Sequence, residues 1–209
     1  MFFDKVEVMN MCETYLIAGQ QGRGKTHTII NELSSIEPTE TETTVSPVLW
    51  LTTNNVRGIK ENRKKNWFLH PITNYEEFLV SLKEIKKIPV KFDAIVVDCI
   101  DDLYRFALSD ARNRNKPIGI LTQHDYLVTA ENIIRDVRQI LRATDRLFCT
   151  INIVRSSSGS LSLSVNRDFY NKFIPIFTDR WVCVSKVTKE GTDYAVIKDL
   201  HKLSEYAPN

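Results

Sequence analysis

The chain has no long apolar run, no excess of either charge and no closely spaced pair of cysteines. No segment approaches the roughly 20 consecutive apolar residues of a membrane-spanning helix, so we expect no membrane partner. The first residues, Met1 to Glu7, show no basic lead followed by an apolar stretch, so we expect no signal peptide and a cytoplasmic location. The net charge of +2 predicts neither a nucleic-acid nor a membrane partner by itself.

Cysteine and histidine are both scarce. The cysteines Cys12, Cys99, Cys149 and Cys183 form no CxxC pair, and three of them lie in apolar, strand-like runs. We therefore expect reduced, buried thiols, as is usual for proteins of a reducing compartment. The four histidines lie far apart, and none has the spacing of a metal-ligand pair.

The composition is that of a globular protein. Apolar residues make up 43% of the 209 residues and charged residues 26%, which excludes collagen-like, coiled-coil and wholly disordered chains. This length suits one large domain better than two small ones. We predict one domain over residues 1–200 and a polar tail over residues 201–209.

Short apolar segments alternate with amphipathic helical patterns along most of the chain. This alternation predicts an α/β fold with a mainly parallel sheet and helices on both faces. A pair of strands joined across Glu190 and Gly191 predicts a β-hairpin near the C-terminus. The predicted strands are 15–18, 48–51, 92–97, 147–154, 181–187 and 194–197, and the predicted helices are 25–33, 74–87, 101–114 and 129–144.

One motif carries a specific chemistry. The segment Gly19-Gln-Gln-Gly-Arg-Gly24-Lys25-Thr26 matches the phosphate-binding loop, or P-loop, GxxxxGK[ST] in full. It leaves a predicted strand and opens a predicted helix, as phosphate binding by backbone N–H groups and a helix N-terminus requires. The alternative is a tight strand-to-helix turn without a ligand. The predicted nucleotide-binding residues are Gly19, Gln20, Gln21, Gly22, Arg23, Gly24, Lys25, Thr26 and His27.

A P-loop protein that uses Mg²⁺ also needs a carboxylate at the tip of another strand. The segment Phe92-Asp-Ala-Ile-Val-Val-Asp98 supplies Asp98 at the end of an apolar run. We expect Lys25 to reach the β- and γ-phosphates and Thr26 to bind Mg²⁺, with Asp98 binding the ion directly or through water.

The residue that would activate a water molecule is not apparent. Cys99 follows Asp98 where many P-loop ATPases have glutamate, and the second strand ends in threonine and asparagine without an acid. Asp101 and Asp102 are candidates, although acids at this position often cap a helix instead. Asn152, in the fourth predicted strand, is our candidate contact to the γ-phosphate, with a buried hydrogen-bonded role as the alternative. Slow or partner-dependent hydrolysis follows as a hypothesis.

The order of these segments resembles phage-encoded RecA-like ATPases known as phage nucleotide-binding proteins, which include single-strand annealing proteins. The resemblance spans roughly residues 14–200. It rests on the P-loop, Asp98, the segments Gln123-His-Asp-Tyr126 and Phe177-Thr-Asp-Arg-Trp181, and the closing hairpin. It implies a RecA-like core, ATP and Mg²⁺, a homo-oligomeric ring or filament, single-stranded DNA and phage replication or recombination partners in a bacterial host cytoplasm. The chain departs from this family in two places. It lacks the acid after the second strand, and it differs at Asn152 in the fourth predicted strand, which we call the sensor strand because it would contact the γ-phosphate.

Two segments could bind single-stranded DNA, which requires cations for its phosphates and aromatic faces for its bases. The first precedes Trp67 and Phe68; the alternative is a solvated basic loop with both aromatic side chains in the core. The second, from 155 to 172, follows the sensor strand and is Ser-rich; the alternative is a mobile linker. The predicted cations are Arg57, Lys60, Arg63, Lys64 and Lys65 in the first segment, and Arg155, Arg167 and Lys172 in the second.

A third set of cations follows a helical period. Arg135, Arg138 and Arg142 share one face of a predicted helix, which is most often simply a solvated face. In an oligomer, one of these residues, or Lys186 or Lys189, could reach a neighbour's γ-phosphate.

We therefore predict a RecA-like P-loop ATPase that handles single-stranded DNA in phage recombination or replication. Its predicted catalytic residues are Lys25, Asp98, Asn152 and Asp101. Three alternatives remain open: a partner-regulated ATPase such as a helicase loader or a packaging or defence-related regulator, a nucleotide kinase, and a nucleotide-binding structural subunit that does not hydrolyse ATP.

Overall fold

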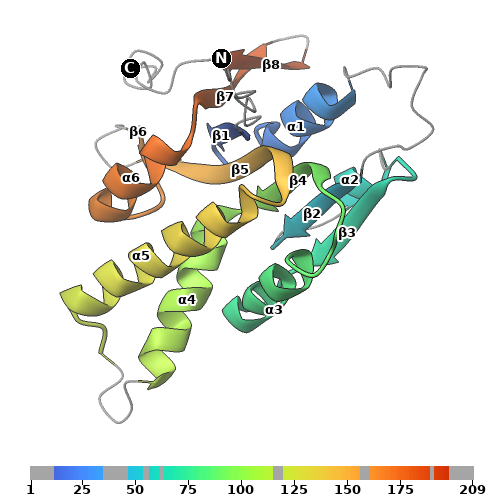
Figure 1. The fold of residues 1–209 in the computed structure, drawn as a ribbon. Coiled ribbons are helices and arrows are strands. Elements are labelled where there is room, and N and C mark those ends of the chain that lie inside the picture. Colours follow the sequence, from blue (N-terminus) through green and yellow to red (C-terminus); the bar gives the residue numbers. More distant parts are fainter. Residues whose placement is uncertain are drawn as a thin grey trace, which may run out of the picture.

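The computed structural model describes residues 12–34, 47–53, 57–61, 64–114, 120–155, 161–188 and 191–197. In this part of the chain a twisted sheet separates two layers of helices (Figure 1). Six strands run parallel, and an antiparallel strand closes one edge. The division into a domain over residues 1–200 and a tail stays a prediction, because residues 198–209 lie outside the described ranges.

The strand order decides what meets at the sheet's carboxyl edge. The order is β3-β2-β4-β5-β1-β7-β8, with β6 paired to β5 alone. One strand, β5, therefore separates β1, which leads into the P-loop, from β4, which ends in Asp98. This arrangement confirms the predicted α/β class, a mainly parallel sheet flanked by helices and closed by a C-terminal hairpin. The strands are β1 (Glu13–Gly19), β2 (Val48–Thr52), β3 (Trp67–Pro71), β4 (Phe92–Asp98), β5 (Thr144–Arg155), β6 (Leu161–Leu163), β7 (Asp179–Thr188) and β8 (Gly191–Ile197).

Successive strand residues point to opposite sides of the sheet, and helices cover both sides, so both faces are buried. In β4, Ile95 and Val97 pack with the helices of one face, whereas Ala94 and Val96 pack with α1 and α2 on the other. Each described helix is too short or too polar to cross a membrane. The helices are α1 (Lys25–Ser34), α2 (Arg57–Glu61), α3 (Tyr75–Ile85), α4 (Ile100–Arg114), α5 (Gln123–Ile140), α6 (Arg167–Phe173) and the 3₁₀ turn η1 (Ile174–Ile176).

The segment before α3 holds two elements that the sequence pattern did not predict. Residues 57–61 form the short helix α2, and residues 67–71 form the edge strand β3. Trp67 is buried against Trp50, whereas Phe68 is half exposed on the other face of β3. Only one of the two aromatic side chains is therefore in the core, so neither alternative for the pair holds in full.

The predicted bounds of the longest helix were wrong at both ends. α5 begins at Gln123 rather than at residue 129, because Thr122 and Asp125 form a reciprocal capping box. It ends at Ile140, and Thr144 already belongs to β5. The segment Gln123 to Tyr126 is thus the first turn of α5 and not a separate motif before it.

The predicted loop from 155 to 172 is largely ordered. Residues 161–163 pair with β5 as β6, and residues 167–173 form α6, capped by the Asn166 side chain. Phe169 is fully buried against Tyr104 and Phe173, so it presents no face for stacking a base. The prediction of a flexible loop is wrong for residues 161–172, which contain β6 and α6, while DNA binding by this segment stays a prediction. Residues 156–160 lie outside the described ranges.

An apolar groove of about 740 Å³ lies beside the β3 edge. Four partly exposed side chains, those of Phe68, Val80, Ile88 and Val90, contribute to it. The strands and helices that hold the P-loop lie farther along the sheet, so this groove belongs to a different part of the molecule.

Candidate functional site

The loop between β1 and α1 has the backbone of a phosphate cradle. Gly22 and Gly24 adopt φ angles of +74° and +85°, which only glycine tolerates without strain. Gly19 is needed for a different reason, since a Cβ atom there would lie 3.0 Å from the Cys183 carbonyl oxygen. The three glycines of the motif thus allow two tight turns and one close approach to β7. Gln21 and His27 are exposed, and Gln20, Arg23, Gly24 and Thr26 are half-buried.

Lys25 is nearly buried, and it lies over the loop. Its Nζ donates to the carbonyl oxygens of Gly19 and Gln20 at 3.0 and 3.2 Å. It also donates to Oδ1 of Asn152 at 2.8 Å. An ammonium group has three donors, so each has a partner within reach. Asn152 is held there because β5 pairs with β1 in the register Gly19 opposite Asn152.

Asp98 ends β4, which β5 separates from β1, and side chains of two other elements donate to its carboxylate. Thr26 of α1 donates to Oδ2 at 3.1 Å, and Thr150 of β5 donates to Oδ1 at 2.5 Å. The Asp98 residue is almost fully buried. The side chains of Thr26 and Asp98, predicted to share one Mg²⁺ ion, are therefore brought within hydrogen-bond distance of each other.

Asp101 holds Asn152 in a defined orientation. Its carboxylate accepts from the Asn152 backbone N–H at 3.2 Å and from Nδ2 at 2.7 Å. Since the carboxylate can only accept and Lys25 can only donate, the amide of Asn152 has one orientation that suits both. Asp101, Asn152 and Lys25 form a continuous chain from α4 to the P-loop.

Cys99 also donates to Asp101. Burial raises the pKa of the Cys99 thiol, and the charge of Asp101 raises it further. The thiol therefore keeps its proton at neutral pH and remains a hydrogen-bond donor. The peptide bond that joins it to Asp98 is cis.

Asp102 faces the neighbouring strand β2. Its carboxylate accepts from the Thr53 hydroxyl at 2.7 Å and from the guanidinium of Arg105. Thr53 in turn donates its backbone N–H to the Asp98 carbonyl oxygen at 2.6 Å. Asp101 thus links α4 to β5, and Asp102 links it to Thr53 just beyond β2 and to Arg105 of α4 itself. Among the described bonds neither carboxylate caps the helix, which was the expected alternative.

The donor set fits a magnesium-bound nucleotide. Mg²⁺ takes oxygen ligands and commonly binds only one or two protein side chains beside phosphates and water. Thr26 and Asp98 supply such oxygen atoms, next to a glycine loop and a lysine that suit phosphates. These residues would hold the ion, which would offset charge on the phosphate oxygens.

Two residues of the site, Thr53 and Thr150, were missed in the prediction of catalytic residues, whereas Asp102 was named beside Asp101 as a candidate. Thr150 carried a signal, because it stands two residues before Asn152 and so faces the same side of β5. Thr53 carried none, since only the pairing of β2 with β4 brings it to Asp98 and Asp102.

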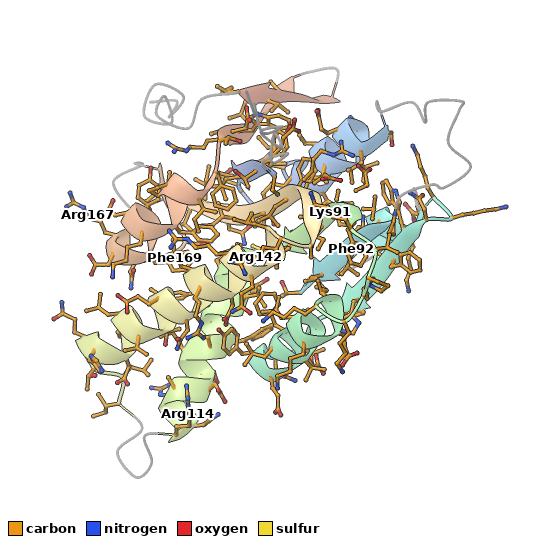
Figure 2. All side chains as sticks on the ribbon, viewed as in Figure 1. Lys91, Phe92, Arg114, Arg142, Arg167 and Phe169 are labelled. Atoms are coloured by element: carbon orange, nitrogen blue, oxygen red, sulfur yellow. The ribbon has the colours of Figure 1, made fainter. Side chains whose placement is uncertain are left out.

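The predicted DNA-binding cations are scattered. Lys60, Lys64 and Lys65 are exposed around the β3 edge, and Arg167 is exposed on α6 (Figure 2). Lys172 forms an ion pair with Glu131 of α5 at 2.6 Å. The side chains of Arg57 and Arg155, and the whole of Arg63, lie outside the described part of the chain.

No protein-family model matches the chain, and no curated protein matches it. Among solved structures it is similar to a KaiC-like protein of the hyperthermophilic archaeon Pyrococcus horikoshii OT3. The identity is 14%, the match covers 90% of this chain and 79% of the other, and the TM-score is 0.49. Identity this low says nothing about ligand or partner, so membership of the phage family stays a prediction.

Proposed function

We propose that the chain binds ATP with Mg²⁺ at the P-loop and hydrolyses it slowly. The observation that carries the proposal is the convergence of Lys25, Thr26 and Asp98 at one edge of the sheet. A turn with no ligand needs neither a lysine buried against carbonyl oxygens nor a buried carboxylate facing the helix N-terminus. The same residue types at this spacing serve phosphate and Mg²⁺ binding.

Each residue has a distinct role in this proposal. Backbone N–H groups of residues 20–25 and the N-terminus of α1 attract phosphate oxygens. Lys25 exchanges part of its present contacts for the β- and γ-phosphates, and Asn152 is left beside the γ-phosphate. Mg²⁺ supplies charge neutralisation when bound by Thr26 and Asp98. Asp101 acts as a positioning residue through Asn152, in place of the catalytic role that the sequence predicts for it.

Slow turnover follows from how the remaining acids are engaged. Asp101 accepts from Asn152 and Cys99, and Asp102 accepts from Thr53 and Arg105. A carboxylate so occupied has fewer positions left to accept a proton from an attacking water molecule. Faster hydrolysis would require a partner that rearranges one of them.

The first experiment measures phosphate release from ATP by the pure protein, with Mg²⁺ or with excess EDTA. We expect slow, Mg²⁺-dependent release that is lost in Lys25→Ala. Binding of a fluorescent ATP analogue, measured alongside, separates a protein that binds without hydrolysis from one that does neither. Failure of the wild type to bind the analogue would exclude the proposal.

A second candidate function is the handling of single-stranded DNA in phage recombination or replication, within a homo-oligomer. Exposed Lys64 and Lys65 lie close in sequence to Phe68, whose side chain is half exposed. Cations beside an open aromatic face suit phosphates and a stacked base. Arg57, Lys60 and Arg63 complete the predicted segment, and Lys172 is the weakest of the predicted contacts because it is paired.

The same assay tests this function when single-stranded DNA is added. Stimulation of phosphate release that disappears in Lys64→Ala/Lys65→Ala would support it. A rate that DNA leaves unchanged would favour a partner-regulated ATPase, and ATP binding without any release would favour a structural subunit.

A further inference from the structure

A basic groove lies at the amino ends of β4 and β5, whereas the P-loop lies at the carboxyl end of β1. Its volume is about 690 Å³, and it is bounded by the connection between α3 and β4 on one side and by the end of α5 on the other. Lys91 and Arg142, labelled in Figure 2, come from these two sides and line the same groove. The five cations that line it are Lys86, Lys91, Arg135, Arg138 and Arg142.

The cations face few opposing charges. No aspartate or glutamate is among the residues described as lining the groove. Lys91 is paired with Asp145 at 2.5 Å, and Arg135 donates to the buried Asp136 at 3.1 Å. Lys86, Arg138 and Arg142 are exposed and form no ion pair within the described ranges. Three of the five cations are thus unpaired within the described ranges and are available to bind an anionic ligand.

We propose that this groove binds the phosphate backbone of a single strand of nucleic acid. A nucleic-acid strand that lies between the two sides of the groove presents a negative charge at every nucleotide. An acidic peptide rarely has so regular a series of charges. Arginine suits phosphate because its planar guanidinium donates two parallel hydrogen bonds. No aromatic side chain lines the described groove, so the bases of a bound strand have no stacking partner there. Binding through the phosphates alone is therefore independent of base sequence.

The proposal rests on the same class of partner as the second candidate function, but on a different surface. It requires no hydrolysis, because the groove lies where β4 and β5 begin and the P-loop lies where the strands end. Loss of ATP binding and loss of nucleic-acid binding are therefore separable by experiment.

The test measures fluorescence anisotropy of a labelled oligothymidylate, without nucleotide, for the wild type and for Arg138→Ala/Arg142→Ala. We expect affinity to fall about tenfold and the slope of log K against log salt to fall by about 1.4, since each lost phosphate contact removes about 0.7 for single strands. The variant should keep the far-ultraviolet circular dichroism and the thermal unfolding midpoint of the wild type, which shows that it is folded.

The matched control is Arg112→Ala/Arg114→Ala, which removes two exposed arginines from the end of another helix. Arg114 lies at the far end of α4 (Figure 2). We expect this control to bind within twofold of the wild type. Wild-type affinity in the groove variant, or an equal loss in both variants, would overturn the proposal. Tighter binding of polyglutamate than of oligothymidylate through Arg138 and Arg142 would also overturn it, in favour of an acidic protein.

Discussion

The orientation of one amide links the acid on α4 to the P-loop lysine. Asn152 presents its oxygen to Lys25 and its nitrogen to Asp101. Both neighbours favour this same orientation, because Lys25 can only donate and the Asp101 carboxylate can only accept. We therefore expect Asp101 to affect nucleotide binding, although it has no described contact with the loop itself.

This linkage predicts the behaviour of Asp101→Asn. The new amide keeps only one accepting oxygen, and its NH2 group faces a donor of Asn152 or Cys99. Asn152 is therefore held less firmly beside Lys25. We expect the Kd for ATP to rise about threefold to tenfold, or about 0.7–1.4 kcal/mol, as measured by titration with a fluorescent analogue. Asp102→Asn should leave this Kd within about twofold, because the described bonds of Asp102 go to Thr53 and Arg105.

Combining substitutions at Asp101 and Asn152 distinguishes a positioning role of Asp101 from a merely structural one. If Asp101 acts through Asn152, adding Asp101→Asn to Asn152→Ala changes the Kd little further, because the shared contact is already lost. Full additivity of the two substitutions would contradict the linkage.

Among the elements, α5 shows how a short local pattern can set a helix start. Thr122 accepts from the Asp125 backbone, and the Asp125 carboxylate accepts from Thr122 in return. The exposed residues of this first turn made the apolar periodicity start later, at Thr129. The cap, rather than the apolar face, marks where α5 begins.

The capping box predicts a measurable cost for Thr122→Ala. Loss of such a cap lowers the free energy of unfolding by about 1 kcal/mol. For a chain of this size the midpoint of thermal unfolding should then fall by about 2–4 °C. His124→Ala, an exposed change in the same turn, should shift it by less. Equal midpoints for Thr122→Ala and the wild type would argue that the helix starts later.

At the scale of the whole molecule, the proposed oligomer ties assembly to the nucleotide. A neighbouring copy that contacts the γ-phosphate gains binding energy only while ATP is present, so ATP should favour the assembled form by mass action. We expect light scattering after size-exclusion chromatography to show a larger mass with ATP and Mg²⁺ than without. Lys25→Ala should show one mass in both conditions. A single mass for the wild type under all conditions would rule out ATP-driven assembly.

Local sequence patterns determined the P-loop, the apolar core strands and the α/β class. The phosphate loop is predictable because its eight residues are contiguous, so its backbone conformation depends on glycines at fixed spacing. Asp98 was predictable for a similar reason, as the polar end of an apolar strand. The edge strand β3 and the helix α6 were not, because their apolar residues are too few to show a period.

Only the tertiary structure decided which distant residues meet. Strand order places β5 between β1 and β4, and this brings Thr150 to Asp98 and Asn152 to Lys25. The basic groove likewise depends on tertiary packing, because Arg142 follows the end of α5 and Lys91 lies in the connection between α3 and β4. The pairing of strands and the docking of helices depend on contacts between residues far apart in the chain, and no local pattern encodes them.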